Sequence, residues 1–290
     1  MAILINKKTR VICQGITGRQ ATLHCRSMLD SGTRLVGGVV PGKGGESHLE
    51  LPVFDAVSDA VQATEATVSV IFVPAYAAAD AILEAAETSI ELIICITRGV
   101  PVQDMLMIKA ALKQHSTQLI GPNSPGVISP GECQVGVMLG DIHQRGGIGI
   151  VSRSGTLLYE AAYQTTRAGL GQSTCVGIGS EPVLGMNIVD CLAQFEQDRQ
   201  TKGIILVGEV AGTGELQAAE YIKKHVRKPV VAYIAGTTSP QDNPSNYFGA
   251  PIGKSKKAAQ EKVLALESAG AYIVRSPAEL GTRMLEYFKG

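Results

Sequence analysis

Two glycine turns in the first half of the sequence contain residue types that suit phosphate binding. The apolar run that ends at Gln14 leads into "GITGRQ", where Gly15 and Gly18 permit a tight turn. A helical pattern begins at Arg19, and the N-terminus of a helix offers backbone N–H groups to an anion. The spacing G-x-x-G is not the dinucleotide fingerprint G-x-G-x-x-G, so plain strand-to-helix geometry explains this turn equally well.

The second turn, "PGKGG" at residues 41–45, places Lys43 among glycines. A site for NAD would have an acidic residue about 20 residues after the first turn, to hold the ribose hydroxyls. A lysine suits a phosphate instead, although a solvated turn lysine fits the same pattern. Together the two turns favour a nucleotide ligand with an extra phosphate. CoA and NADP both qualify, and an NADP-dependent oxidoreductase stays open as a minor alternative.

The second half has a serine turn and a lone carboxylate, each after an apolar run. In "IVSRSGTLLYEAA", Ser152 and Ser154 stand before a helical pattern whose N-terminus can hold a phosphate or carboxylate, and Arg153 can add a bidentate clamp. Glu209 ends the run "IILVGE". It is either a solvated strand end or the partner of a cation or a phosphorylated base.

The elements that position these turns alternate between apolar runs of strand length and helical patterns. The runs at 10–15, 34–40, 68–74, 92–97 and 118–122 form one series, and a second series begins near residue 147. This alternation predicts an α/β protein with two doubly wound parallel sheets, in which ligands bind at the carboxyl ends of strands. We expect domains at 1–125 and 146–290, joined by a Gly/Pro-rich linker at 126–145. The 18 residues from Thr237 to Lys254 form a long loop, which is usually functional or disordered.

Composition excludes several function classes. The 290 residues are 45% hydrophobic and 18% charged with zero formal net charge, so neither nucleic acid nor an anionic membrane is favoured as a partner. The apolar runs are too short to span a membrane, and no signal-peptide layout is present, so we expect a cytoplasmic protein. The six cysteines form no C-x-x-C pair and are interpreted as reduced core residues. The five histidines lack metal-ligand spacing, so no metal site is expected.

Taken together, these segments resemble the α subunit of succinyl-CoA synthetase, the succinate–CoA ligase family. The resemblance covers essentially the whole chain in order, and rests on "ICQGITGRQ", "VGGVVPGKGG", "LPVFD", "GPNSPGVISPGEC", "GIVSRSGTLLYEA", "GQSTCVGIGSEPVLG" and "KPVVAYIAG". It implies a Rossmann-like CoA-binding domain followed by a flavodoxin-like ligase domain. It further implies an ATP-grasp β subunit that holds ATP or GTP with Mg, in a heterodimer or an α2β2 assembly. A small organic acid, a dicarboxylate of the tricarboxylic acid cycle, would be the other substrate.

The resemblance also implies roles for individual residues. Glu209 matches the carboxylate that steadies a phosphohistidine. Ser152, Arg153, Ser154 and Tyr159 match the region that receives the organic acid. The expected CoA contacts are Thr17, Gly18, Arg19, Gln20, Lys43, Ile96, Thr97 and Arg98, with Pro74 and Asn123 at neighbouring strand ends.

One departure affects the chemistry. The family carries its phosphohistidine on the loop after "YIAG", and gap-free counting places Tyr247 at that position. A phenol with a pKa of about 10 accepts and returns phosphate less readily than an imidazole. His143 is retained only as a remote substitute. We therefore expect an acid–CoA ligase subunit whose phosphohistidine relay is altered or absent. The alternative is a non-catalytic CoA-binding paralogue that regulates or assembles with a partner.

Overall fold

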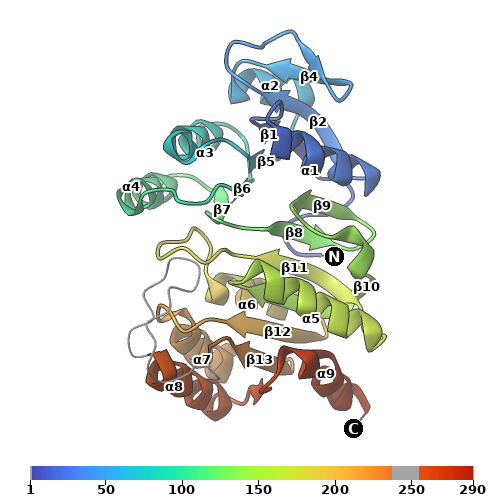
Figure 1. The fold of residues 1–290 in the computed structure, drawn as a ribbon, viewed down its shortest axis with the longest axis vertical. Helices are drawn as coiled ribbons and strands as arrows, with labels where there is room; N and C mark the ends of the chain where they lie inside the picture. The colour runs from blue at the N-terminus through green and yellow to red at the C-terminus, as the bar shows by residue number, and fades with distance from the viewer. Residues whose placement is uncertain (1, 237–254, 290) are drawn as a thin grey trace. The chain divides into compact units, whose positions relative to one another are not determined.

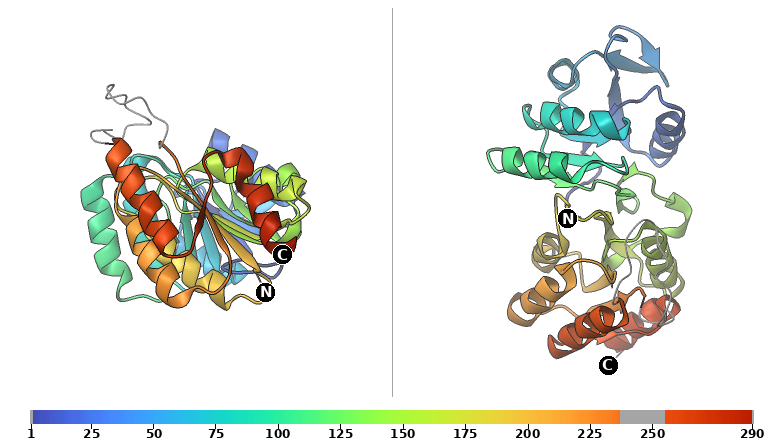
Figure 2. Two further views of the ribbon diagram at one scale, coloured as in Figure 1. Left: turned by 90° about the horizontal axis from the view of Figure 1, so that it is seen from below. Right: turned by 60° about the vertical axis from the view of Figure 1, so that its left-hand side comes forward.

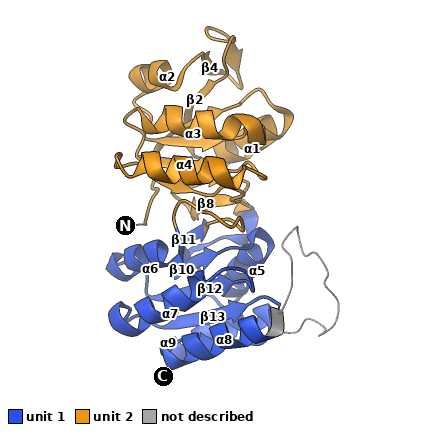
Figure 3. Cartoon of the chain, turned by 90° about the vertical axis from the view of Figure 1, so that its left-hand side faces the viewer, with its two compact units in different colours: residues 1, 141–176, 187–290 blue, residues 2–140, 177–186 orange. Residues whose placement is uncertain are grey.

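The computed structural model describes residues 2–236 and 255–289. The chain divides into two compact units, coloured separately in Figure 3. Unit 2 comprises residues 2–140 and 177–186, and unit 1 comprises residues 141–176 and 187–290 together with residue 1. The units are therefore not continuous in sequence, because residues 177–186 belong to unit 2 although they follow the first part of unit 1. The domain boundaries expected from the sequence stay a prediction.

Unit 2 is built on a parallel sheet whose strands are mostly apolar. The strand order is β4-β2-β1-β5-β6-β7, with β3 antiparallel at the β4 edge. Counted along the chain, the parallel strands follow the order 3-2-1-4-5-6, which is the Rossmann arrangement. The strands are β1 (Arg10–Gln14), β2 (Arg34–Val39), β3 (Ser47–His48), β4 (Leu51–Phe54), β5 (Val68–Ile71), β6 (Leu92–Cys95) and β7 (Gln118–Ile120).

Helices cover both faces of this sheet, which is why its central strands are fully buried (Figures 1 and 2). Ile12, Ile82 and Ile93 lie at the centre of the core with no exposed surface. A hairpin, β8 (Gly126–Ser129) with β9 (Cys133–Gly136), completes the unit. The helices are α1 (Arg19–Asp30), α2 (Val57–Thr64), η1 (Ala75–Ala77), α3 (Ala78–Ala86) and α4 (Val102–Leu112).

Unit 1 contains a second parallel sheet in the order β14-β13-β12-β10-β11. Along the chain this is the order 2-1-3-4-5 of flavodoxin-like folds, with its switch point between β10 and β12. Helices α5 and α9 contact each other, whereas α7 contacts both α6 and α8. The elements are β10 (Arg145–Ser152), β11 (Gln172–Gly177), β12 (Gly203–Gly208), β13 (Val230–Ile234), β14 (Tyr272–Ile273), α5 (Gly155–Arg167), α6 (Ile188–Gln197), α7 (Gly214–His225), α8 (Ser255–Ser268), α9 (Leu280–Lys289), η2 (Gly140–Ile142) and η3 (Pro277–Glu279).

These two strand orders confirm the α/β fold class predicted from the alternating pattern. All six cysteines are free and buried, as expected for core residues. Burial raises the pKa of the Cys95 thiol to about 12. Within residues 2–236 and 255–289, every helix is too short or too polar to cross a membrane.

Candidate functional site

The parallel strands of unit 2 bring the predicted turns to one edge of the sheet. β1 pairs in parallel with both β2 and β5, and β6 pairs with β5 and β7. The segments that follow these strands therefore lie at the same edge. This edge holds the turns with Gly18 and Lys43 and the strand ends with Pro74, Thr97 and Asn123.

The turn after β1 leaves the N-terminus of α1 without a capping side chain. Gly15 adopts a φ of 81°, and a Cβ there would lie 3.2 Å from the carbonyl oxygen of Phe72. Gly18 is the N-cap and makes no side-chain hydrogen bond to the first turn. Thr17 is half-buried, and Arg19 and Gln20 are exposed. A helix end of this kind can accept an anion at its first N–H groups.

Two backbone N–H groups of the Lys43 turn form hydrogen bonds that fix its conformation. The Lys43 N–H donates to Val40 O at 3.1 Å, and the Gly44 N–H donates to Asp55 Oδ1 at 2.9 Å. Gly42 and Gly45 have φ values of 79° and 85°, which a residue with a side chain rarely adopts. The side chain of Lys43 is half-buried. The turn thus places one cation at the strand edge on a defined backbone.

The segments that follow β5, β6 and β7 are joined to one another by hydrogen bonds. Thr97 Oγ1 donates to Val73 O at 2.6 Å, and the Asn123 N–H donates to Thr97 O at 2.8 Å. Pro74 and Arg98 are exposed at this edge, and Ile96 is half-buried. Thr97 and Asn123, two of the candidate CoA residues, therefore belong to one hydrogen-bonded network with the end of β5.

The segment at residues 177–186 also reaches this network, which the sequence did not predict. Ser180 Oγ accepts from Asn123 Nδ2 at 3.1 Å, and Glu181 Oε1 accepts from the Gly99 N–H at 3.3 Å. Gly185 N donates to Gly121 O at 2.9 Å. No local pattern in "GIGSEPVLGM" signals this pairing, because it joins residues far apart in the chain.

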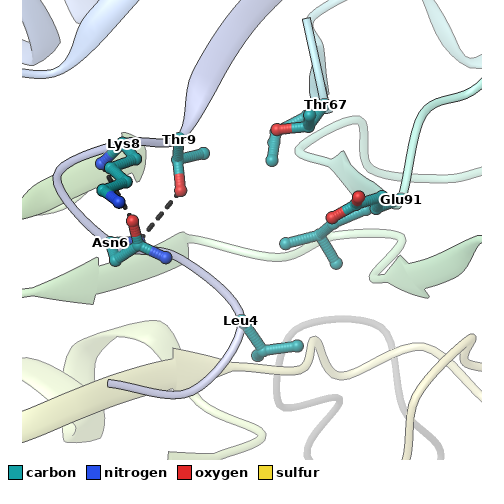
Figure 4. Close-up of a pocket in the computed structure, with 8 residues that line it drawn as sticks. Leu4, Asn6, Lys8, Thr9, Thr67 and Glu91 are labelled. Atoms are coloured by element: carbon teal, nitrogen blue, oxygen red, sulfur yellow. Dashed lines mark hydrogen bonds between the residues drawn. The ribbon is translucent and has the colours of Figure 1, made fainter. Parts of the chain in front are cut away.

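A polar cavity of about 200 Å³ lies at the opposite ends of the same strands (Figure 4). Thr9 precedes β1, Thr67 precedes β5 and Glu91 precedes β6. Lys8 and Asn6 face it from the segment before β1 (Figure 4). The cavity marks the amino ends of the strands, so it is not the site that the turns form.

In unit 1 the serine turn after β10 folds on itself. Ser152 Oγ donates to Ser154 O at 2.7 Å and accepts from the Ser154 N–H at 3.1 Å. Ser154 is the N-cap of α5 and accepts from the Leu157 N–H. Tyr159 is half-buried in the first turns of α5, and burial raises the pKa of its hydroxyl. The serines therefore stabilise the start of the helix that carries Tyr159.

Four charged residues gather beside this turn, at the switch point of the unit 1 sheet. Lys262 Nζ lies 2.6 Å from Glu215 Oε2, and Arg153 Nη1 lies 4.0 Å from Glu215 Oε1. Arg153 Nη1 also donates to Ala211 O at 2.6 Å. Glu209 follows β12, and its N–H donates to Glu215 Oε1 at 2.9 Å. The structure thus joins Arg153 and Glu209, both predicted from the sequence, to Glu215 and Lys262, which were missed.

The carboxyl of Glu209 has an unusual environment. Burial raises its pKa, the guanidinium of Arg153 lowers it, the carboxylate of Glu215 raises it and the ammonium of Lys262 lowers it, and the result is a raised pKa. A half-buried carboxyl of this kind can accept a hydrogen bond from a cation or act as a base. Its chemistry therefore depends on the three charges around it.

A weak signal for the missed residues is present in the sequence. Glu215 occupies the same helical stripe as Ala218 and Ile222, and Lys262 the same stripe as Ala259 and Leu266. Charged side chains on helices usually face solvent, so neither was singled out. A charge at a position where the 3.6-residue period predicts an apolar residue is the signal that could have identified both.

The other two candidates have different outcomes. His143 is buried two residues before β10, at the end of that strand opposite to Arg153. Tyr247 lies outside the described residues. In the part of the chain that the structure describes, no cluster of His, Cys, Asp and Glu has the makings of a metal site.

Comparisons with known proteins cover both units. A CoA binding domain model matches residues 6–99, and a CoA-ligase model matches residues 151–272. The succinate–CoA ligase [ADP-forming] subunit alpha of Aquifex aeolicus is 52% identical, over 100% of this chain and 95% of that protein. The subunit of the same name from Staphylococcus aureus is 48% identical, over 100% and 96%.

Solved structures show the same fold in longer chains. ATP citrate lyase from Methanothrix soehngenii, in complex with citrate and coenzyme A, matches with a TM-score of 0.89 at 27% identity. The match covers 99% of this chain and 50% of that one, so the present chain spans about half the length of that protein. An acetyl-coenzyme A synthetase from Ca. Korarchaeum cryptofilum matches with a TM-score of 0.72 at 19% identity, which shows a likeness of fold alone.

Proposed function

Because the chain belongs to the succinate–CoA ligase α subunit family, we propose that it binds CoA in unit 2 and contributes to acyl-CoA formation in unit 1. As the α subunit of an acid–CoA ligase, it needs a second chain for the nucleotide. An ATP-grasp β subunit would hold ATP or GTP with Mg, in a heterodimer or an α2β2 assembly. The cytoplasm is the location that we propose for this complex.

The observation that carries the CoA proposal is the convergence of two anion-binding features on one strand edge. The uncapped N-terminus of α1 suits a pyrophosphate, and the Lys43 turn adds a cation for a further phosphate. We propose that Thr17, Gly18, Arg19, Gln20 and Lys43 contact the phosphates. The remaining CoA contacts would be Pro74, Ile96, Thr97, Arg98 and Asn123, which follow β5, β6 and β7.

In unit 1 we propose that the N-terminal turn of α5, with Ser152, Arg153, Ser154 and Tyr159, receives the organic acid. Glu209 would act beside it, as a carboxylate partner for a cation. The acid, a dicarboxylate such as succinate, would be activated as an acyl phosphate. The nucleotide leaves as its diphosphate when its γ-phosphoryl group is transferred. The CoA thiolate would then attack the acyl carbon and displace inorganic phosphate.

The residue at the relay position decides how the phosphate travels. With Tyr247 in place of histidine, we propose that the acid carboxylate attacks the γ-phosphorus of the nucleotide directly. This step makes the same acyl phosphate and releases the same diphosphate, so the overall balance does not change. It removes the need for a phosphorylated enzyme.

The test is acyl-CoA formation from ATP, CoA and succinate by this chain co-purified with its β subunit. The expected result is turnover by the unmodified complex. No phosphate should remain on the protein, whether the gel samples are kept under acidic or under alkaline conditions. The matched variant is Tyr247→His. If the unmodified complex is silent and histidine restores turnover, the direct route is wrong and the chain is a CoA-binding scaffold that has lost the family reaction.

A further inference from the structure

The buried ion pair of Glu215 and Lys262 forms hydrogen bonds with the backbone N–H and the backbone carbonyl of Glu209. Glu215 Oε1 accepts from the Glu209 N–H at 2.9 Å, and Lys262 Nζ donates to Glu209 O at 2.7 Å. Lys262 Nζ donates also to Ala211 O at 3.1 Å. None of these bonds uses the Glu209 carboxylate. Within the part of the chain that the structure describes, these bonds hold the backbone of Glu209 and do not engage its carboxylate oxygens.

We propose that Lys262 and Glu215 are positioning residues, which hold the Glu209 carboxylate at the strand edge and balance its charge. The role concerns the orientation and charge of Glu209, and its link to turnover rests on the proposed function. Arg153 serves the same arrangement, because its Nη1 donates to Ala211 O at 2.6 Å, the carbonyl that also accepts from Lys262. Helices α7 and α8 and the turn after β10 thus meet at the short segment after β12.

Packing alone does not explain charges at these positions. Glu215 has no exposed surface, and Lys262 is 2% exposed. Removing two charges from water costs several kcal/mol per ion, and apolar residues of similar volume often stabilise a fold as well or better. Both residues lie on otherwise apolar helix stripes, where leucine or methionine would fit. A charged pair there serves the groups that it contacts, and those groups belong to residues 209–211.

The end of β12 leaves space for the side chain of Glu215, because its last residue is glycine. β12 ends at Gly208, and a Cβ at that position would lie 2.6 Å from Glu215 Cγ. A larger residue would push the carboxylate of Glu215 away from the Glu209 N–H. The absence of a side chain at Gly208 is therefore part of the same device.

The charges of the cluster balance. Arg153 and Lys262 contribute two positive charges, and Glu209 and Glu215 two negative ones. Lys262 lowers the pKa of the Glu209 carboxyl, whereas Glu215 raises it. We therefore expect removal of Lys262 to raise the pKa of Glu209 and removal of Glu215 to lower it. A pair whose charges did not act on Glu209 would leave its pKa unchanged.

The experiment measures the Glu209 carboxyl by carbon-13 NMR in chain labelled at glutamate, within its β-subunit complex, across pH. The Glu209 signal is identified by its loss in Glu209→Gln. We expect Lys262→Met to raise the pKa of Glu209 and Glu215→Gln to lower it. We also expect kcat for acyl-CoA formation to fall, by up to about 100-fold, with KM for CoA unchanged.

Lys228→Met is the matched control. Lys228 Nζ also donates to two backbone carbonyls, Phe195 O and Asp198 O, both at 2.6 Å. It precedes β13 and so lies at the other edge of the same sheet. The control should leave the pKa of Glu209 and kcat as they are in the unmodified complex. If Lys262→Met behaves like this control, or if both cluster variants shift the pKa in the same direction, the proposal is wrong.

A second variant covers the case in which Lys262→Met fails to fold, since it leaves Glu215 buried without its cation. The double variant Lys262→Met with Glu215→Leu removes both charges and keeps the volume. A folded double variant with reduced kcat supports the positioning role, and one with full kcat overturns it. If the unmodified complex shows no turnover, the proposed function fails, and the opposite pKa shifts still test whether the pair balances the charge of Glu209.

Discussion

Lys43 shows how a single cation is placed by residues that do no chemistry themselves. Gly42 and Gly45 supply the left-handed backbone of the turn, and the carboxylate of Asp55 accepts the Gly44 N–H at 2.9 Å. A Cβ on Gly44 would lie 2.4 Å from Asp55 Oδ2, so a side chain there would displace the carboxylate that accepts from the Gly44 N–H. The ammonium is therefore carried by a turn with little freedom.

Reversing this charge should weaken CoA binding. Lys43→Glu replaces a phosphate partner by a repelling carboxylate, so we expect a loss of about 1–3 kcal/mol, or about 5- to 150-fold in Kd. Isothermal titration calorimetry, with CoA titrated into the chain, measures this change in Kd. Lys8→Glu carries the same charge change at the opposite end of the unit 2 strands and should bind CoA normally. Equal affinity for Lys43→Glu and Lys8→Glu would make Lys43 a solvated turn residue.

The sequence predicts site residues that follow strands better than those on helices. Lys43, Arg153 and Glu209 could be proposed as site residues because each follows a predicted strand, and parallel strands end at a common edge. Glu215 and Lys262 could not be assigned in the same way, since most charged helix residues face water. Whether they meet Glu209 depends on how α7 and α8 pack, which no local pattern specifies.

At the scale of the element, α6 begins with a reciprocal cap. The Asp190 N–H donates to Asn187 Oδ1 at 3.1 Å, and the Asn187 N–H donates to Asp190 Oδ2 at 2.8 Å. Two N–H groups that the helix geometry leaves unpaired are thus satisfied. The cap fixes where the chain re-enters unit 1 after the segment 177–186.

Removing this cap should cost about 1 kcal/mol of unfolding free energy, the usual loss for Asn→Ala at an N-cap. Urea unfolding of Asn187→Ala followed by circular dichroism measures the change. Thr213→Ala is the control, because Thr213 is the N-cap of α7 and its side chain makes no capping bond. Its unfolding free energy should change by only a few tenths of a kcal/mol. Equal losses for the two variants would show that the Asn187 side chain does not stabilise α6.

Strands that are unbroken or nearly unbroken apolar runs were predicted well, whereas the β8–β9 hairpin was not. β5 and β6 stand out as four consecutive buried residues, which is typical of a covered parallel sheet. The β8–β9 hairpin was read as part of a linker, because its strands GVIS and CQVG mix apolar residues with glycine and polar residues inside a Gly/Pro-rich segment. Its turn is nevertheless recognisable: the Glu132 N–H donates to Ser129 O at 2.9 Å, and Gly131 has a φ of 73°.

At the scale of the whole molecule, unit 2 is assembled from two separate stretches of the sequence (Figure 3). Residues 177–186 return to it and bond to the chain around β7: the Gly185 N–H donates to Gly121 O, and the Met186 N–H to Leu119 O. A sequence read from one end to the other suggests a single boundary between the series. Only the long-range hydrogen bonds reveal that unit 2 includes residues from the second half of the sequence.

A fragment of residues 1–140 should therefore be less stable than the same fragment extended by a Gly/Ser linker and residues 177–186. Each recovered backbone hydrogen bond contributes about 0.5–1.5 kcal/mol, so these two predict a gain of about 1–3 kcal/mol. Urea unfolding measures the gain, and CoA titration shows whether the strand edge also recovers its affinity. A fragment with residues 177–186 in scrambled order controls for the added length, because it cannot repeat the contacts of Ser180 and Glu181 at that edge. Equal stability of all three fragments would mean that the returning segment is only a connection, and that the first 140 residues form a complete CoA-binding unit.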